Sequence, residues 1–391
     1  KGTALGRWLP TAAIVFQDPP RDDPYGYGHW FPTPPPVLIC IAPLSKLSAT
    51  GAAIVWAALK IGGLAVVGWL LLREVGLPLG GLPLGVLITA AAFGARPIIS
   101  DFQHANLNTF MAIWVGLSVI FYLKRRDALA GVFLALAVVT KITPALLLLY
   151  FVYKRAWRLC MACGASLVVV VLVLPSLVIG WSQNNEWIES WFNMLVAPFM
   201  LKGYATLELE NQSLYGVVMR LLSNAGWLQV DQMSGEELKR VGMEGMVRPV
   251  TALGRLIRPA ISLSGIATML WFCRGRLPNR RDPRFLLEVG LVLVLMLLLG
   301  ERTWKHHATT LPIVYLAVWY SLTCFDWPER FRACMAAGLG VQFFLISLSG
   351  EGLFGERLAD HMLDGGFFCW GLLLCAVQIA LMLARWKRLP T

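Results

Sequence analysis

The chain has 391 residues, of which 57% are hydrophobic and 15% are charged. Soluble domains carry about 25% charged residues, so these values exclude a disordered chain, a coiled coil and an ordinary soluble enzyme, and they predict a multi-span membrane protein. The formal net charge of +11 is typical of basic cytoplasmic loops. The basic residues are not interleaved with stacking aromatics, so we expect no nucleic-acid partner.

Apolar segments of about 17–25 residues are candidate membrane spans. In chain order they are 48–72, 82–98, 108–123, 159–180, 256–273, 285–299, 308–324, 333–349 and 366–384. We therefore expect an all-α polytopic membrane protein with a bundle of about nine full spans. The chain begins at Lys1 rather than Met, and we expect its N-terminus to be incomplete.

A further apolar stretch, 128–153, is interrupted by Lys141, Thr143 and Pro144. Basic clusters flank it at both ends, so it cannot cross the membrane once. The sequence predicts two short helices, 128–140 and 142–153, which form a hairpin with Lys141 at its apex. Proline suits the start of the second helix.

The basic clusters fix the expected topology, with the C-terminus and the clustered loops in the cytoplasm. The segments on the outer side are then 1–36, 98–107, the Lys141 apex, 181–255, 300–307 and 350–365. All five histidines lie on that side. We expect a multi-pass protein of the cell (plasma or inner) membrane, with its chemistry on the extracytoplasmic face.

The long outer segment 181–255 is expected to be an insertion in a single transmembrane domain, 1–391. It begins with Trp181, Trp187 and Trp191 among polar residues, a pattern typical of an interfacial amphipathic helix. A second helix is expected around 212–223 and a mixed-charge loop over 231–248.

The eight cysteines lie almost entirely in apolar runs, so they are interpreted as small core residues. Cys160 and Cys163 have C-x-x-C spacing, but no βαβ pattern or second ligand pair accompanies them. We expect no metal site and no cofactor.

Polar residues gather where the segment 98–107 meets the next span. They are Asp101, His104, Asn106 and Asn108. A helix N-cap with a polar first turn explains part of this pattern. Four such side chains exceed what one cap needs, so a polar substrate site is the second interpretation.

Lys141 and the outer loop 301–307 carry positive charge on the outer side of the membrane, where the expected topology places few basic residues. A lysine deep in apolar sequence is costly and predicts a function, although it can also extend its ammonium to the interface. Residues Glu301, Arg302, Lys305, His306 and His307 form either an ordinary basic loop or a phosphate-binding patch with acid–base histidines.

Two further segments hold weaker candidates. Asn211 and Gln212 suit a loop cap or a substrate contact. In the N-terminal segment, the aspartates are either solvated turn residues or a catalytic base, and a basic residue adds a possible anion contact: Asp18, Asp22, Asp23 and Arg7.

The order and spacing of these motifs resemble glycosyltransferase family 87. The stretch Asp101-Phe-Gln-His-Ala-Asn-Leu-Asn108 is followed by Ala130-Gly131, Lys141-Ile-Thr-Pro-Ala145, Asn211-Gln-Ser-Leu214 and Trp304-Lys-His-His307. Residues 31–35, Phe-Pro-Thr-Pro-Pro, look like the family's Tyr-Pro-Pro segment. The match extends from about residue 27 to 325.

The resemblance implies a GT-C membrane fold and transfer of a hexose, mannose-like, from a polyprenyl-phosphate-linked sugar donor to a lipid or glycan acceptor. It implies inversion, an extracytoplasmic site, and no metal or nucleotide sugar. The family has a catalytic Asp in its first outer loop, preceded by a helix. This chain has no Asp at the comparable distance, within Lys1 to Trp8, and that helix is missing.

We therefore expect Asp101 to be the base, with Asp18, Asp22 and Asp23 as its alternatives, unless this branch of the family carries out other chemistry. Lys141, Arg302, Lys305 and His306 are expected to stabilise the leaving phosphate. The alternative is a transporter or flippase for an anionic or lipid-linked substrate, because broken helices and intramembrane cations also mark transport sites. A structural membrane subunit without a site is a third interpretation.

Overall fold

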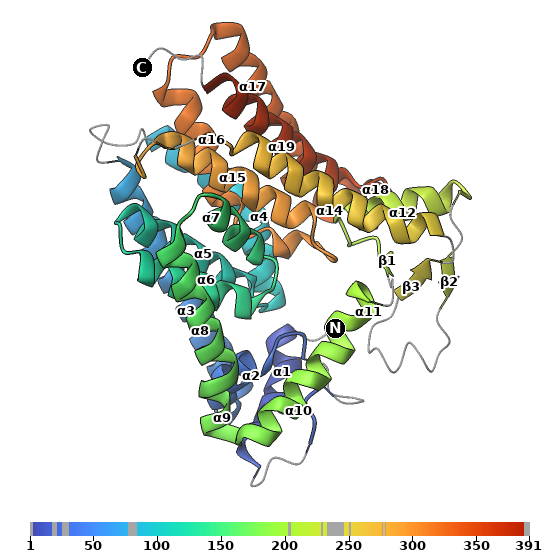
Figure 1. The fold of residues 1–391 in the computed structure, drawn as a ribbon. Helices are drawn as coiled ribbons and strands as arrows, with labels where there is room; N and C mark the ends of the chain where they lie inside the picture. The colour runs from blue at the N-terminus through green and yellow to red at the C-terminus, as the bar shows by residue number, and fades with distance from the viewer. Residues whose placement is uncertain are drawn as a thin grey trace.

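A bundle of helices forms the larger part of the chain, and a group of short helices lies below it in the view of Figure 1. The computed structural model describes residues 3–17, 22–25, 31–76, 84–201, 205–227, 230–232, 246–249, 252–275, 277 and 279–386. Asp18 lies outside these residues, as does one of the five histidines, His29.

The lower group joins the N-terminal segment to two later helices. It contains α1 (Ala4–Ala12), η1 (Ala13–Phe16), α2 (Pro35–Ile41), η2 (Ala42–Lys46), α9 (Leu174–Ile179) and α10 (Trp181–Trp191). Trp8 packs edge-on against Phe31 with 5.6 Å between ring centroids. The same apolar core includes Trp187 of α10 and extends to Leu107 and Val139. This core therefore supports the turn at residues 105–107 and the turn at Lys141–Pro144, which carry polar residues of the candidate site.

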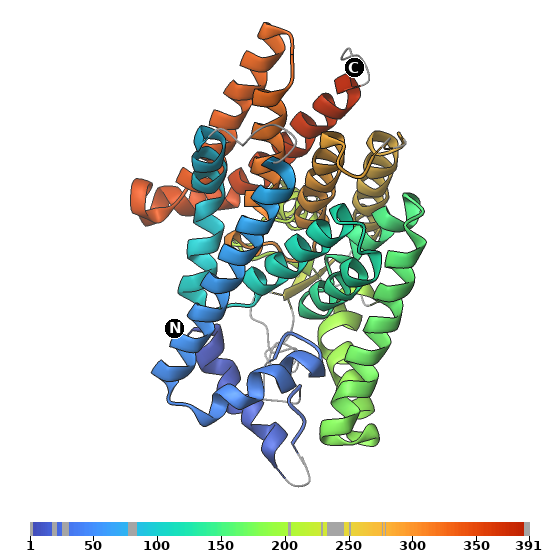
Figure 2. The same ribbon diagram turned by 90° about the vertical axis from the view of Figure 1, so that its left-hand side faces the viewer.

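The bundle is built around one fully enclosed helix. Its elements are α3 (Ala49–Gly76), α4 (Leu84–His104), α5 (Asn108–Leu123), α6 (Asp127–Thr140), α7 (Ala145–Tyr153), α8 (Trp157–Val168), η4 (Val169–Val173), α14 (Ala252–Phe272), α15 (Pro283–Leu298), η6 (Lys305–His307), α16 (Leu311–Cys324), α17 (Glu329–Phe343), η7 (Phe344–Leu348), α18 (Glu351–Asp364) and α19 (Phe367–Trp386). Every residue of α15 from Arg284 to Leu298 is buried. Its apolar residues from Val289 onward suit a fully enclosed helix, and its buried Arg284 and Glu288 form an ion pair with each other. Figure 2 shows α3 rising from the lower group into the bundle.

Among the described residues, four helical segments are long and apolar enough to cross a membrane: Ala49–Glu74, Trp157–Ile179, Glu329–Leu348 and Phe367–Trp386. The expected number of about nine spans is not confirmed. Helices α5, α15 and α16 have only 14 to 16 residues, which is about 21–24 Å of helix against an apolar core of about 30 Å.

The predicted division of this stretch into two short helices with Lys141 between them is confirmed. Helix α6 ends at Thr140, α7 begins at Ala145, and Lys141 between them is extended, with φ −156° and ψ 133°. Both helices pack against α8. The break at Lys141–Pro144 therefore divides one apolar stretch into two helices, and it places the lysine at the turn.

The segment 181–255 departs from the all-α expectation through one small sheet. Its remaining elements are η5 (Phe192–Val196), α11 (Ala197–Met200), β1 (Ala205–Thr206), α12 (Leu214–Asn224), β2 (Val230–Gln232) and β3 (Met246–Pro249). The strands are antiparallel, in the order β1-β3-β2. Strands β2 and β3 occupy the ends of the expected loop 231–248, whose residues 233–245 lie outside the described residues. The two expected helices are confirmed as α10 and α12.

Candidate functional site

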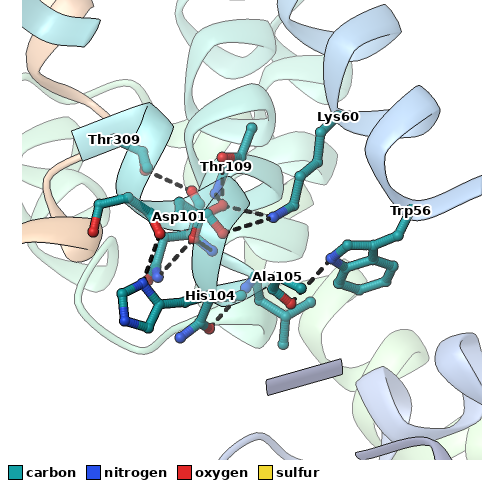
Figure 3. A network of polar contacts seen from close by, with 11 residues as sticks. Trp56, Lys60, Asp101, His104, Ala105, Thr109 and Thr309 are labelled. Atoms are coloured by element: carbon teal, nitrogen blue, oxygen red, sulfur yellow. Dashed lines mark hydrogen bonds and ion pairs between the residues drawn. The ribbon is translucent and has the colours of Figure 1, made fainter. Parts of the chain in front are cut away.

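Asp101 lies at the centre of a buried polar network in the last turn of α4 (Figure 3). Its side chain is fully buried. Oδ1 accepts hydrogen bonds from the backbone N–H and Nδ2 of Asn108, at 3.2 and 3.1 Å. Oδ2 accepts from the backbone N–H of Thr109 at 3.3 Å and from its Oγ1 at 2.6 Å. Asp101 thus satisfies the free amides at the start of α5 and places negative charge at that positive helix end.

Lys60 of α3 completes this network. Its Nζ donates to Oδ2 of Asp101 at 2.7 Å, and both side chains are inaccessible to solvent. Lys60 is absent from the site residues predicted above. The signal was nevertheless present, because Lys60 is the only charged residue in the expected span 48–72, and a charge within a span needs a partner.

These contacts argue against the expected role of Asp101 as the base. Both carboxylate oxygens are already occupied by donors, and the group is sealed from any acceptor hydroxyl. A general base must reach the proton that it removes. Capping of α5 explains the geometry better, although Asp101 caps it from α4 while Leu107 occupies the N-cap position. We therefore interpret Asp101 as a positioning residue for the turn between α4 and α5.

His104, one turn after Asp101, is exposed. Its Nδ1 lies 2.7 Å from the carbonyl oxygen of Ser100. A carbonyl oxygen only accepts hydrogen bonds, so Nδ1 carries the proton, and Nε2 of the neutral ring is an acceptor. The ring stacks on that of His306, with 4.7 Å between centroids and an interplanar angle of 25°. The geometry thus presents an imidazole acceptor beside the Asp101 network and the ring of His306.

His306 and His307 lie in η6, between α15 and α16. His306 is buried between His104 and Trp304, whose ring meets it edge-on at 5.2 Å. Burial lowers the pKa of His306 to about 2, and its neighbours His104, Lys141 and Lys60 act in the same direction. Burial and the charge of Lys141 also hold the pKa of His307 well below its usual value. Both rings are therefore neutral, which argues against His306 as a cation for phosphate or as an effective base.

Lys141, at the turn between α6 and α7, joins the Asp101 network through Asn108. Its Nζ donates to Oδ1 of Asn108 at 3.2 Å, and Asn108 in turn contacts Asp101. Burial lowers the pKa of Lys141 to about 7, the charge of Arg302 acts in the same direction, and Asp101 opposes both. Within the described residues, no carboxylate lies within ion-pair distance of this ammonium. Lys141 is thus a cation without a paired counter-charge.

Arg302 and Glu301 are each paired with another residue of the insertion or of α14. Nη2 of Arg302 donates to Oε1 of Glu208 at 2.9 Å, and Glu301 forms an ion pair with Arg258. Burial raises the pKa of Glu301 to about 7, against the opposing charges of Arg258 and Arg302. Arg302 remains close enough to Lys141 to influence its pKa, so its charge contributes to the same field.

The side chain of Asn211 holds the 301–303 loop in place, and that of Gln212 binds the end of α18. Oδ1 of Asn211 accepts from the backbone N–H of Thr303 at 3.0 Å, and its Nδ2 donates to the carbonyl of Glu301 at 3.1 Å. Nε2 of Gln212 donates to the carbonyl of Leu363 at 2.8 Å. Both side chains are fully buried. The loop-cap interpretation therefore fits them, and the substrate-contact interpretation does not.

The remaining candidates lie elsewhere. Oδ1 of Asn106 accepts from the next backbone N–H, at 2.8 Å, within its own turn. Asp22 accepts from Gln17 at 3.0 Å, and Asp23 accepts from Ser190 of α10. Arg7 is exposed on α1. In the described part of the chain, neither aspartate has a hydrogen bond or ion pair with Asp101, Lys141 or residues 301–307, so a role for either as the base stays a prediction.

The ammonium of Lys305 lies apart from Lys141, with which the sequence grouped it as a phosphate-stabilising cation. Its Nζ donates to the carbonyl of Ser349, at the end of η7. The charges that act on it are those of Arg96 and Glu351, whereas Lys141 responds to Asp101 and Arg302. The two lysines therefore belong to different electrostatic surroundings.

Comparison with known proteins places this cluster in context. The model of glycosyltransferase family 87 matches residues 31–299. A curated relative from Mycobacterium tuberculosis (strain ATCC 25618 / H37Rv) is 30% identical over 228 residues. It is the polyprenol-phosphate-mannose-dependent alpha-(1-2)-phosphatidylinositol mannoside mannosyltransferase, and the matched region covers 55% of this chain and 50% of the relative. The chain thus spans about half the length of that protein. Because the family model matches well over half of its residues, the chain belongs to glycosyltransferase family 87.

Proposed function

We propose that the protein is an integral-membrane glycosyltransferase. It moves a hexose, which we propose to be mannose, from a polyprenyl-phosphate-linked donor to a lipid or glycan acceptor. The transfer inverts the configuration at the anomeric carbon. Membership of glycosyltransferase family 87 supports the reaction class. The name of the mycobacterial relative supports the donor and a glycolipid acceptor.

One observation carries the proposal. Three segments that are distant in sequence converge on Asn108: the α4–α5 turn with Asp101, the hairpin with Lys141, and the start of α16, where Thr309 Oγ1 donates to the carbonyl of Asn108 at 2.7 Å. The convergence leaves the ammonium of Lys141 without a carboxylate partner among the described residues. A partly buried, unpaired cation suits the phosphate of a lipid-linked sugar.

The proposed reaction has one displacement step. The acceptor hydroxyl oxygen forms a bond to the anomeric carbon, and its proton passes to Nε2 of His104. The bond between the anomeric carbon and the phosphate oxygen breaks, and its electron pair leaves with polyprenyl phosphate, which becomes a dianion. Lys141 stabilises this added charge, and Arg302 contributes to the field. Removing one such donor typically lowers kcat about 10²–10³-fold.

The proposed site faces the extracytoplasmic side of the cell membrane, and the C-terminus lies in the cytoplasm. The basic clusters at residues 124–126, 154–158 and 274–284 support this orientation. The hairpin apex and η6 are then on the opposite side from these clusters. Membrane lipids surround the apolar helices, including the candidate span Trp157–Ile179, whose Leu177 is 77% exposed.

Incubation of membranes that contain the full chain with radiolabelled polyprenyl-phosphate mannose tests the proposal. A transferase forms a labelled lipid or glycan together with unlabelled polyprenyl phosphate. A transporter or flippase moves intact labelled donor across the vesicle and forms no new labelled product. The second result would replace the proposal with the transport alternative.

A further inference from the structure

Arg96 and Lys305 meet at Gly350. Arg96 belongs to α4, Lys305 to η6, and Gly350 follows the hydrogen-bonded carbonyl of Ser349. A side-chain carbon placed on Gly350 would lie 3.7 Å from Nη2 of Arg96 and 3.7 Å from Nζ of Lys305. The two cationic groups therefore flank one point beside a residue that has no side chain to fill it.

No counter-charge is paired with these two cations. In the described part of the chain, the guanidinium of Arg96 has no hydrogen bond or ion pair, and Lys305 has no ion pair. Glu351 acts on Lys305, but from beyond ion-pair distance. Burial and the charge of Arg96 lower the pKa of Lys305 to about 8. Two partly buried like charges repel one another, and an anion between them offsets that repulsion.

The other cations of this region contrast with this pair. Lys60 is paired with Asp101, Arg302 with Glu208, and Arg258 with Glu301. Each of these three cations is thus neutralised by a carboxylate of the chain itself. The pair of Arg96 and Lys305, like Lys141, is left for a ligand.

Exposed apolar side chains lie within three residues of Arg96 or of Gly350 in the sequence. Ile99 is 49% exposed, Leu348 is 37% exposed and Leu353 is 62% exposed. Leu348 is also the last residue of the candidate span Glu329–Leu348, so the cations lie at the end of a membrane-crossing segment. Phosphates of lipids lie at this level, with acyl chains next to them. The position of Gly350, directly after a candidate span, favours a lipid-borne phosphate over a free one.

We propose that Arg96 and Lys305 bind the phosphodiester of a phospholipid-type acceptor. The assignment to the acceptor rests on the proposed function, because Lys141 is there assigned to the donor phosphate. Lys305 directly precedes His306, which stacks on the proposed base His104. A headgroup anchored at Arg96 and Lys305 would therefore hold its sugar or inositol hydroxyls beside the acid–base residue.

Binding is tested without catalysis by native mass spectrometry of the detergent-solubilised full chain. The probes are phosphatidylinositol, an uncharged diacylglycerol of the same chain length, and inorganic phosphate. We expect phosphatidylinositol to bind, and Arg96→Gln and Lys305→Gln each to weaken it about tenfold or more. Lys305→Arg keeps the charge and should retain binding. Arg357→Gln, on the exposed face of α18, is the matched control and should bind normally.

The outcomes separate the possibilities. Equal binding of phosphatidylinositol and diacylglycerol, or unchanged binding in both glutamine variants, would overturn the site. Inorganic phosphate that displaces the lipid completely at equal concentration would overturn the preference for a lipid-borne phosphate. In transfer assays, both glutamine variants should raise the acceptor KM and leave the donor KM unchanged, and the reverse pattern would overturn the acceptor assignment. If the wild-type protein transfers no sugar, the proposed function fails while the binding result still stands.

Discussion

Lys60 and Asp101 form a fully buried ion pair, with 2.7 Å between Nζ and Oδ2, that joins α3 to the last turn of α4. The pair fixes the turn at Ala105, whose φ of 49° is in the left-handed region and whose carbonyl accepts from Nε1 of Trp56 at 3.1 Å. The same turn presents His104 and begins α5 with Asn108. The ion pair therefore holds the catalytic candidates in place without taking part in the chemistry.

Lys60→Met should destabilise the protein by about 3–5 kcal/mol, because it leaves a buried carboxylate without its counter-charge. The double variant Lys60→Met, Asp101→Asn removes both charges and should recover part of that loss. Thermal unfolding in one detergent, followed for both variants and the wild type, measures the difference. Equal loss in the single and double variants would mean that the pairing itself contributes nothing.

Asp101→Asn should lower activity through misplacement of the α4–α5 turn, with no change in the shape of the pH–rate profile. The reason is that its oxygens cap α5 and bind Lys60. The kinetic profile is measured alongside the melting temperature. Loss of an entire ionisation from the profile, in a variant that melts normally, would restore Asp101 as the base.

His104→Gln should lower kcat about 10²–10⁴-fold, the usual contribution of a positioned acid–base group. His306→Phe keeps an aromatic ring for the stack on His104, so it should retain most of the activity. Assays at saturating donor and acceptor compare the two. Greater loss in His306→Phe than in His104→Gln would exchange the roles assigned to the two rings.

The affinity for the donor should fall as the pH rises above about 7. Burial lowers the pKa of Lys141 to about 7, so the ammonium loses its proton over this range and no longer attracts phosphate. Lys141→Arg keeps its charge at all these pH values and should remove this dependence. The donor KM measured from pH 6 to 9 in both proteins checks the claim, which a flat wild-type profile would contradict.

The sequence predicted the hairpin because Lys141 and Pro144 interrupt an apolar stretch between two basic clusters. It did not predict that α4 continues through Pro97 to His104. Proline leaves the carbonyl four residues earlier without its helical donor. Here Ser347 Oγ donates to that carbonyl, of Phe93, at 3.3 Å. The donor comes from η7, and local sequence around Pro97 carries no sign of it.

Partners distant in sequence account for the other differences. The cost of burying Lys60 indicates a partner for it, but the choice of Asp101 depends on how α3 packs beside α4. Lys305 directly precedes His306, yet its ammonium donates to the carbonyl of Ser349 and lies beside Gly350, as does Arg96. Sequence patterns therefore identified residue types suited to phosphate chemistry, and tertiary packing divided them into paired and unpaired cations.

The most direct measurement of the central claim uses Lys141 variants of the purified full chain with labelled polyprenyl-phosphate mannose. Lys141→Gln should lower kcat about 10²–10³-fold, while Lys141→Arg should retain more of it and both should melt near the wild-type temperature. Sugar transfer by Lys141→Gln at the wild-type rate would contradict the assignment of Lys141 to the leaving phosphate.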